Sequence, residues 1–562
     1  MNFINQLNTV AKGILIFLAV VLMRFLASAQ IPRPLHIGVT NGVATVSSPT
    51  SPGYFFSQLE TSTNLTPPMV WTGTLSPVMM PGVRSNFPAT GSQSFFRLRQ
   101  AWPVYEFAIF YNLNMEIDPG GVMPINGLVF SDAGIWAGSA SVTFNSAVIA
   151  VNQVNTNIND PFLNGKTGSG PPAFLLAGQP VSGASPLRLP YLAFSSQPTN
   201  AEAILNLPPP AYALGTANAY SPTGQLYLAN AADLIISNAY FGTNRAAPLG
   251  TNFSIWFQDP FQTPYLTPIM PDFYRLKIAA TTGLYTNYVT SNLSDTNRCY
   301  TNVAYAGWSF VTNCAFYDYR EGNVAQAVQI NVGLFNVWLT NQLRSTFGGS
   351  YSATCNSDKG HTIDSIWIYN SVPRDYSTFP AVRVINGVQL ANSWGLTVAT
   401  PMPVYVLGDY NKQTDATHAS NGTNTIYTYP EALMGDAITL LSTNWLDSYN
   451  SSTFLPSRNP VSTTVNAACF EGIVPSFTNT SNSTYYYSGG VENSLRFLEY
   501  WAGTTLTYNG SIVVMFPSII ATNVWGGSYY GVPTRNWGFD FNFLQQTKLP
   551  PLTPQVVNFA SP

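Results

Sequence analysis

The chain has 562 residues, of which 46% are hydrophobic and only 8% are charged. Its 22 basic and 25 acidic residues leave a formal net charge of −3, which gives no electrostatic basis for binding nucleic acid or an anionic membrane surface. Asn, Thr, Ser and Gly supply the polarity instead. This composition is typical of an extracellular β protein with many turns, and we expect no nucleic-acid partner.

The first 29 residues have the three parts of a secretory signal peptide. A polar stretch ends at Lys12, an apolar run covers Ile14–Met23, and the small residues Ala27-Ser28-Ala29 precede Gln30. The apolar run is short for a bilayer span, although Arg24 after it leaves an uncleaved anchor as the alternative. We expect a signal peptide at 1–29, export to the extracellular space or the outer cell surface, and membrane contact only through an uncleaved N-terminal segment.

Residues 31–100 form a unit of their own. Alternating apolar and polar residues in GVATVSS, GYFFSQLE and SFFRLRQ, separated by Pro- and Gly-rich turns, predict a small β-sandwich. The strings LETSTNLTPPMVWT and PATGSQSFFRLRQ resemble a small β module common in large secreted proteins of Gram-negative bacteria. That resemblance implies a surface or extracellular context and no catalytic role.

The rest of the chain, 105–562, is expected to form one long β domain. In Ala381–Ser442, apolar runs of four to seven residues are cut by turn dipeptides such as Asn386-Gly387 and Gly408-Asp409, which predicts strands. Very short strands also follow one another in Gly127–Val151. Because such strands are unstable alone, we expect them to stack into an irregular right-handed parallel β-helix, an all-β solenoid. An ordinary sandwich with long loops is the alternative.

Several segments depart from this strand pattern. Residues 155–222 and 444–487, rich in small and polar residues, are expected to be loop excursions. Apolar residues from Val332 to Leu339 predict a short covering helix. A second helical stripe is expected from the spacing of Val491, Leu495, Leu498 and Trp501. The proline-rich segment from Thr534 onward is expected to cross the fold as a terminal strap.

A further resemblance covers the chain from about Phe107 to the C-terminus. The strings FYDYREGNVAQAVQINV, AVRVINGVQL, GLTVATPMPVYVLGDYN, ALMGDAITLLS and GGVENSLRFLEYWAGTTLTYNGSIVVMF are similar to the passenger regions of PilX-like pilus-assembly and surface proteins. The resemblance implies a right-handed β-helix, export to the envelope, and a role in surface structure or adhesion. The chain lacks a pilin-type leader, since Leu18 stands where that leader has Glu.

The four cysteines lie outside any C-x-x-C pair, so zinc and thioredoxin chemistry have no support. In an oxidising compartment an even number permits disulfides. Cys299 and Cys314 flank an expected hairpin and are the first candidate pair, which would leave Cys355 and Cys469 for the second. Unpaired buried thiols are the alternative.

No catalytic or cofactor motif is present. His36, His361 and His418 lie in different segments without the spacing of metal ligands. The sequence also has no nucleophile elbow, no phosphate-binding loop and no dinucleotide fingerprint. We therefore expect no cofactor and no enzymatic activity.

Carboxylates provide the enzymatic alternative, because some β-helices cleave polysaccharide with a pair of carboxyl groups roughly 5–10 Å apart. The acidic candidates are Asp318, Glu321, Asp409, Asp436, Glu492, Glu499 and Asp540. For each of them an ion pair or a turn contact is the simpler interpretation.

Aromatic residues make up 14% of the chain, which suits either a packed interior or a carbohydrate-contacting face. The candidate exposed cluster consists of Tyr485, Tyr486, Tyr487, Trp525, Tyr529 and Tyr530. The sequence as a whole predicts a structural or adhesive surface protein whose partners are cell-envelope or pilus-type proteins. A polysaccharide-binding or polysaccharide-degrading β-helix, and a minor pilin-like component held by its N-terminus, remain as alternatives.

Overall fold

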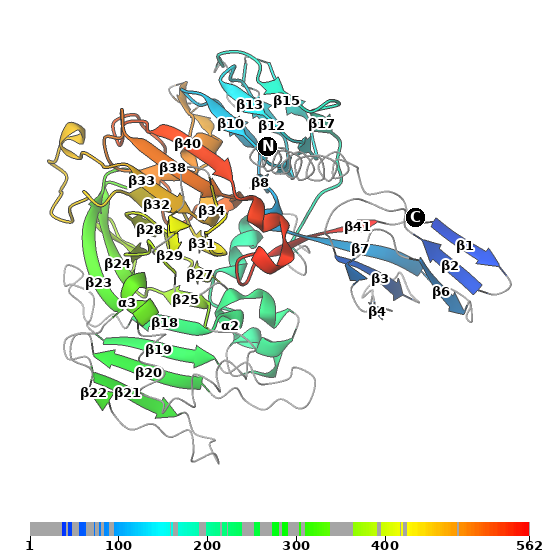
Figure 1. Cartoon of the computed structure of the whole chain (residues 1–562), viewed down its shortest axis with the longest axis horizontal. Helices are drawn as coiled ribbons and strands as arrows, with labels where there is room; N and C mark the ends of the chain where they lie inside the picture. The colour runs from blue at the N-terminus through cyan, green and yellow to red at the C-terminus, as the bar shows by residue number, and fades with distance from the viewer. Residues whose placement is uncertain are drawn as a thin grey trace, which may run out of the picture.

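A computed structural model describes the chain in four main stretches: 101–238, 310–337, 363–412 and 424–560, with gaps at 158, 161–166, 190–197, 214–215, 222, 391–394, 480 and 482. Strands within 36–100, 252–304 and 413–419 are described by their backbone (Figure 1). The expected signal peptide at 1–29 lies outside the described residues.

The region preceding the main body contains two antiparallel sheets. One has the order β1-β2-β6, and the other the order β4-β3-β7-β41, with β5 also paired to β3. Their strands are β1 (His36–Thr40), β2 (Val43–Ser47), β3 (Phe56–Ser62), β4 (Thr72–Gly73), β5 (Val78–Met79), β6 (Arg84–Pro88), β7 (Phe95–Pro103) and β41 (Gln555–Ala560). The β module expected at 31–100 stays a prediction, and the C-terminal strand β41, from far along the chain, pairs with β7 in this region.

The main body is organised around a 14-stranded sheet. Its ten parallel strands, in spatial order, are β17 (Val181–Ser182), β14 (Val148–Ala150), β11 (Val129–Ser131), β8 (Ile109–Tyr111), β39 (Ile512–Pro517), β34 (Ala468–Ile473), β31 (Glu431–Gly435), β27 (Leu396–Ala399), β25 (Ser365–Tyr369) and β18 (Leu234–Asn238). Antiparallel strands β19 (Asn252–Gln258), β20 (Phe273–Ala279), β21 (Leu284–Val289) and β22 (Val303–Ala304) extend one end. Most strands are too short to be stable alone, so their stability depends on this stacking.

Further sheets run beside the large one. A six-stranded sheet contains β23 (Val311–Asp318), β24 (Asn323–Asn331), β26 (Thr378–Ile385), β28 (Val404–Leu407), β32 (Ile438–Leu441) and β37 (Leu495–Phe497). Three parallel sheets of three strands combine β33 (Thr463–Asn466), β38 (Thr505–Gly510) and β40 (Thr534–Phe539); β9 (Met115–Ile117), β12 (Ile135–Ala137) and β15 (Val154–Asn155); and β10 (Met123–Ile125), β13 (Val142–Phe144) and β16 (Ala173–Phe174). Two small hairpins pair β29 (Gln413–Asp415) with β30 (His418–Ala419), and β35 (Phe477–Asn479) with β36 (Thr484–Tyr486). The described chain is thus mostly β, with largely parallel sheets, as expected.

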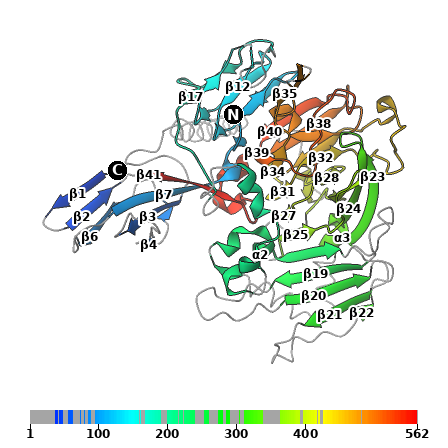
Figure 2. The same cartoon turned by 180° about the vertical axis from the view of Figure 1, so that it is seen from behind.

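The order of strands in space differs from their order in sequence. From β18 the chain advances through β25, β27, β31 and β34 to β39 (Figure 2), and the next strand in the sheet is β8, from the beginning of the domain. Strands β11, β14 and β17 then continue in the same direction. The first and last parts of the domain therefore meet at a seam between β39 and β8.

Backbone and side-chain contacts close this seam. Ile512 N–H donates to Ala108 C=O at 2.9 Å, and Asn112 N–H donates to Val514 C=O at 2.8 Å. The Ser511 hydroxyl donates to Phe107 C=O at 2.5 Å. Nearby, β41 pairs antiparallel with β7 and buries Val556 and Val557.

Asparagine side chains support the turns between stacked strands. The Asn411 amide donates to Asn466 C=O at 2.9 Å, and the Asn466 amide donates back to Asn411 C=O at 3.0 Å. The Asn509 amide continues the series by donating to Asn466 Oδ1 at 2.7 Å. All three side chains are buried, so each of these bonds satisfies polar groups that the stacked turns remove from water.

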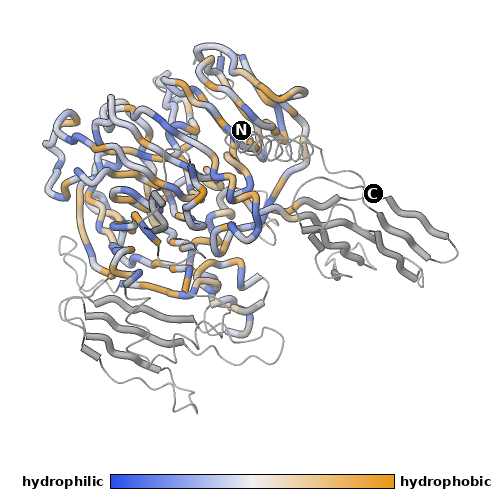
Figure 3. Tube along the Cα trace, in the orientation of Figure 1, coloured by the Kyte–Doolittle hydropathy of each residue, from blue (hydrophilic) through white to orange (hydrophobic). Residues whose placement is uncertain are grey.

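Each face of the six-stranded sheet has its own apolar core. Val328, Val382 and Val404 belong to the main core, whereas Ala327, Ala381 and Tyr405 belong to a second, smaller core. This alternation follows the two-residue period of a strand. Hydrophobic residues recur along the strands throughout the main body (Figure 3). We call the side with the smaller core the second face.

The helix predictions had opposite outcomes. The covering helix is present as α3 (Val332–Val337), and the other α-helix in the described part of the chain is the single turn α2 (Leu228–Ala231). The second helical stripe was wrong: a 3₁₀ turn at Val491–Asn493 leads directly into strand β37. Every residue from 491 to 499 is buried, so a helix-like spacing of apolar residues here reflects burial on all sides.

Candidate functional site

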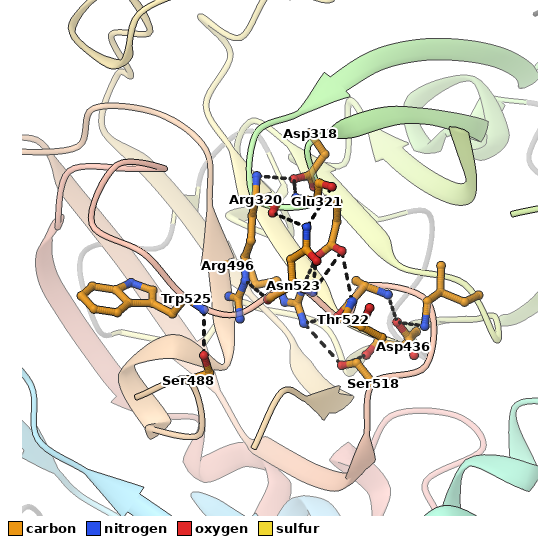
Figure 4. Close-up of polar contacts among 12 residues, drawn as sticks. Asp318, Arg320, Glu321, Asp436, Ser488, Arg496, Ser518, Thr522, Asn523 and Trp525 are labelled. Carbon is orange, nitrogen blue, oxygen red and sulfur yellow. Dashed lines mark hydrogen bonds and ion pairs between the residues drawn. The ribbon is translucent and has the colours of Figure 1, made fainter. Parts of the chain in front are cut away.

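The strongest concentration of charge lies on the second face of the six-stranded sheet, beneath the segment 518–523 that follows β39. We call 518–523 the clamped segment, because two carboxylates bind its backbone (Figure 4). Asp436 accepts hydrogen bonds from the N–H groups of Ile519, Ile520 and Ala521 at 2.6, 3.1 and 2.7 Å. Asp436 is fully buried and follows strand β31.

Glu321 binds the next part of the same segment. Its carboxylate accepts from the N–H groups of Thr522 at 3.1 Å and Asn523 at 3.2 Å. Arg496 on β37 donates to Glu321 at 3.0 Å and to Ala521 C=O at 2.8 Å. Burial raises the pKa of both Glu321 and Asp436, while Arg496 and the backbone N–H groups oppose the shift. These two carboxylates therefore hold a chain segment in place, with their acceptor positions occupied by the protein itself.

Asp318 is the last residue of β23, and Arg320 lies in the turn that leads to β24. Asp318 accepts from the N–H groups of Arg320 at 2.7 Å and Glu321 at 2.8 Å, and from the Tyr405 hydroxyl at 2.5 Å. Glu321 forms its ion pair with Arg496, which lies on another strand, β37. Burial lowers the pKa of the Arg320 guanidinium to about 9, and the positive charge of Arg496 adds to this effect.

A second ion pair lies elsewhere on the same face. Arg383 on β26 makes two hydrogen bonds to the Asp447 carboxylate, at 2.6 and 2.8 Å, and two more to Gln329 Oε1. Its guanidinium carbon also lies 5.0 Å from the centre of the Phe316 ring. Asp447 lies in the stretch between β32 and β33, so this contact ties that stretch to the sheet. The loop excursion expected over all of 444–487 was wrong, because β33 and β34 lie within that range and belong to the stacked sheets.

The structure brings together three of the candidate carboxylates, Asp318, Glu321 and Asp436, and distributes the others. Asp409 pairs with Lys412 at 2.8 Å, Glu492 accepts from Asp118 N–H at 3.3 Å, and Asp540 accepts from the Thr425 hydroxyl at 2.7 Å. Glu499 accepts from both the N–H and the hydroxyl of Ser442. Each of the seven acidic candidates is thus bonded to its own chain.

Sequence reasoning missed several buried glutamates, among them Glu431 on β31 and Glu471 on β34. Glu431 accepts from the Tyr410 hydroxyl at 2.8 Å, and Glu471 accepts from Ile438 N–H at 3.1 Å. Burial raises the pKa of Glu431 well above its ordinary value and that of Glu471 to about 8. Because a strand sequence such as EALMG does not tell which side chains face inward, only the register of the sheets could identify these glutamates.

The candidate aromatic cluster is exposed in part only. Tyr485 is 45% exposed, but Tyr530 is 7% exposed, so its prediction as a ligand-facing residue was wrong. The Tyr530 ring packs 5.3 Å from that of Phe497, between centroids. Tyr486, Tyr487, Trp525 and Tyr529 are half-buried. Tyr486 stacks on Phe477 across the β35–β36 hairpin at 4.9 Å, and Phe477 is 43% exposed.

Cys314 and Cys469 are free thiols in the structure, and their expected partners Cys299 and Cys355 lie outside the described residues. Cys314 is on β23, which pairs with the following strand β24. Cys469 is buried in the main core, where burial raises the pKa of its thiol.

No group of three or more His, Cys, Asp or Glu residues with the arrangement of a metal site occurs in the part of the chain that the structure describes. Within the same residues, none of the helices has the length and hydropathy needed to cross a membrane. Comparison of the chain with known protein families, with curated proteins and with solved structures gives no match.

Proposed function

We propose that this chain is a secreted or cell-surface protein with a structural or adhesive role, and that its body is an irregular right-handed parallel β-helix. The successive parallel strands and the asparagine series at their turns support the β-helix. Right-handed connections are favoured for parallel strands in general. The low charge content and the N-terminal sequence support export.

One observation carries the structural role. The acidic residues that a hydrolase would need are bonded to backbone N–H groups, hydroxyls and basic groups of the same chain, as Asp436 and Glu321 show. Groups used in this way stabilise turns and segments. A body of stacked β sheets with few charges suits a scaffold exposed outside the cell, with cell-envelope or pilus-type proteins as partners.

The test is surface labelling of intact cells with an antibody against the purified protein, together with an attachment assay of a deletion strain. We expect labelling without permeabilisation and weaker attachment to a surface or to other cells. Labelling only after permeabilisation would reject the proposed location. Unchanged attachment of the deletion strain would reject the adhesive role.

The second candidate function is polysaccharide binding, favoured by the exposed Phe477 ring, which stacks on the half-buried Tyr486 ring of the β35–β36 hairpin. Ring stacks of this kind present apolar surface with a polar hydroxyl at the edge. A panel of polysaccharides, scored for both retention and release of reducing ends, separates the two roles. Retention without release indicates an adhesin directed at carbohydrate, whereas release of reducing ends would reject the proposal that the protein has no catalytic activity.

A further inference from the structure

The β35–β36 hairpin presents different side chains on its two sides. Its register pairs Phe477 with Tyr486, and Thr478 with Tyr485. Because side chains alternate along a strand, Phe477 and Tyr486 lie on one side of the hairpin, whereas Thr478 and Tyr485 lie on the other. We call the side with Phe477 and Tyr486 the ring side.

The opposite side of the hairpin contacts the body of the protein. The hairpin lies close to β12 (Figure 2), and the Tyr487 ring, directly after β36, packs 6.3 Å from the ring of Trp136 on β12, between centroids. On the same side, the hydroxyl of Thr478 is buried. The ring side keeps an exposed aromatic group, since Phe477 is 43% exposed.

The stacked pair leaves one aromatic face open. The ring centroids of Phe477 and Tyr486 are 4.9 Å apart, and the ring planes differ by 23°. Tyr486 therefore covers one face of the Phe477 ring, and the exposed area of Phe477 lies on its other face and its edge. The apolar C–H face of a pyranose sugar packs on such a ring, because both surfaces leave water. The next pair on the ring side, Asn479 and Thr484, carries amide and hydroxyl groups of the kind that bond to sugar hydroxyls.

The hairpin carries no charge, whereas carboxylates lie against its root. No charged residue occurs in the hairpin or in the residues that follow it up to Glu492. A Cβ atom on Gly489 would lie 2.8 Å from Glu116 Oε1, and one on Gly490 would lie 2.6 Å from Glu492 Oε1. Both carboxylates are thus in close contact with the glycines at the root of the hairpin, and both glutamates are buried.

The hydroxyl of Tyr487 lies in the field of these and other acids. Burial raises the pKa of this hydroxyl, and negative charges raise it further, those of Glu492, Glu116, Asp118 and Asp160. The basic side chain of Arg535 donates to Glu492 C=O at 3.3 Å. Negative charge therefore predominates at the root of the hairpin, and an acidic sugar chain placed on the ring side would be repelled by it.

We infer that the ring side of the β35–β36 hairpin binds an uncharged hexose polymer, with the open face of the Phe477 ring as the surface on which a sugar stacks. The stack on Tyr486 fixes the orientation of this ring before binding, so binding costs little conformational entropy. The uncharged hairpin above an acidic root favours a neutral chain over an acidic one. This inference rests on the second candidate function, polysaccharide binding, and names the ligand class and the contact residue.

The experiment is equilibrium binding of a β-1,4-linked glucose hexamer to the purified protein, beside a galacturonic acid hexamer and a glucosamine hexamer. We expect the glucose hexamer to bind about tenfold more tightly than either charged hexamer, and its Kd to rise about tenfold in Phe477→Ala. Tyr485→Ala is the matched control, because Tyr485 is 45% exposed on the opposite side of the same hairpin, and it is expected to bind as the wild type does. If Phe477→Ala disrupts the hairpin, Phe477→Leu provides the same test, since it keeps an apolar side chain against Tyr486 and removes the ring.

The outcomes separate this site from the function on which it rests. Equal or tighter binding of a charged hexamer overturns the uncharged ligand class and leaves polysaccharide binding standing. Unchanged binding of the glucose hexamer by both Phe477 variants, or an equal loss in Tyr485→Ala, overturns the ring side as the site. Failure of every hexamer to bind overturns both this inference and the second candidate function, while the surface-attachment test decides the adhesive role independently.

Discussion

Glu321 and Asp436, which are far apart in the sequence, together accept hydrogen bonds from five successive backbone N–H groups, those of residues 519 to 523. Arg496 joins the two sites by donating to Glu321 and to Ala521 C=O. These hydrogen bonds hold the backbone of a segment that has no regular secondary structure. The carboxylates replace the neighbouring strand that would otherwise have bonded these groups.

Replacement of Asp436 by Asn is expected to destabilise the fold by about 2–4 kcal/mol. The carboxylate offers two acceptor oxygens to three backbone N–H groups, whereas the amide of Asn offers only one. Chemical denaturation measures the change. Asp375→Asn is the matched control, since Asp375 accepts from the N–H groups of Ser377 and Thr378 in an exposed turn. Equal losses in the two variants would contradict a special role for the buried carboxylate.

Stability is expected to fall as the pH rises from 4.5 to 8. Burial raises the pKa of Glu471 from 4.5 to about 8, so within this window the unfolded chain releases a proton that the folded chain keeps. The contribution is fully present below pH 4.5 and lost above pH 8, with a slope of up to about 1.4 kcal/mol per pH unit. Glu499, with its pKa raised by burial to about 7, adds to the slope between pH 4.5 and 7.

The free energy of unfolding, measured by urea denaturation from pH 4.5 to 9, tests this expectation. Glu471→Gln removes the titrating group and keeps the shape, so its stability curve is expected to be flatter than that of the wild type. A variant curve parallel to the wild-type curve would show that Glu471 ionises in the folded protein much as it does in the unfolded chain.

The C-terminal strand β41 is expected to stabilise the module that precedes the main body. Val556 is fully buried where β41 pairs with β7, so Val556→Asp places a carboxylate in an apolar site and is expected to cost about 3 kcal/mol or more. Hydrogen exchange is expected to accelerate in 95–103. The neighbouring half-buried Gln555 provides the control Gln555→Asp, and similar exchange in both variants would exclude the proposed coupling.

Gly395 is expected to tolerate no side chain. Its φ is +93°, and a Cβ atom there would lie 1.6 Å from Pro430 C=O, so Gly395→Ala must displace the backbone that precedes β31. We expect a loss of about 2 kcal/mol or more and a lower Tm. Gly527→Ala, at an exposed glycine with open space around it, is expected to change the Tm by less than about 2 °C. A Tm for Gly395→Ala close to that of the wild type would refute the strain argument.

The sequence predicted the local elements best where several signals agreed. Between Ala381 and Ser442, turn dipeptides and short apolar runs indicated strands, and β26, β27, β28, β31 and β32 contain those runs. The short helix α3 was predicted from continuous apolar residues. The helix predicted at 491–501 was wrong because, in a segment that is buried on every side, the apolar residues can have any spacing, including that of a helix.

The candidate site could be predicted only as a set of residue types. Asp318, Glu321 and Asp436 were identified as acidic candidates, but their partners Arg496 and the backbone of 519–523 lie on other strands and loops. Hydrogen bonds between residues so distant in sequence depend on the register of the sheets. The same reason explains why Tyr530 was expected at the surface and lies instead against Phe497.

By itself, the sequence determined that this chain has strands shorter than a stable sheet requires, few charges, and many turn residues. These properties favour stacked β structure, because such short strands need neighbouring strands to bond their backbone N–H and C=O groups and to bury their apolar side chains. The tertiary structure alone decided that β8 lies beside β39, and that the first strands of the domain continue the stack formed by the last. Local propensity does not specify which strand edges meet, since every parallel edge offers the same N–H and C=O groups. At this seam the meeting of the two edges is supported by the hydrogen bonds from Ser511 to Phe107 C=O and from Ile512 N–H to Ala108 C=O.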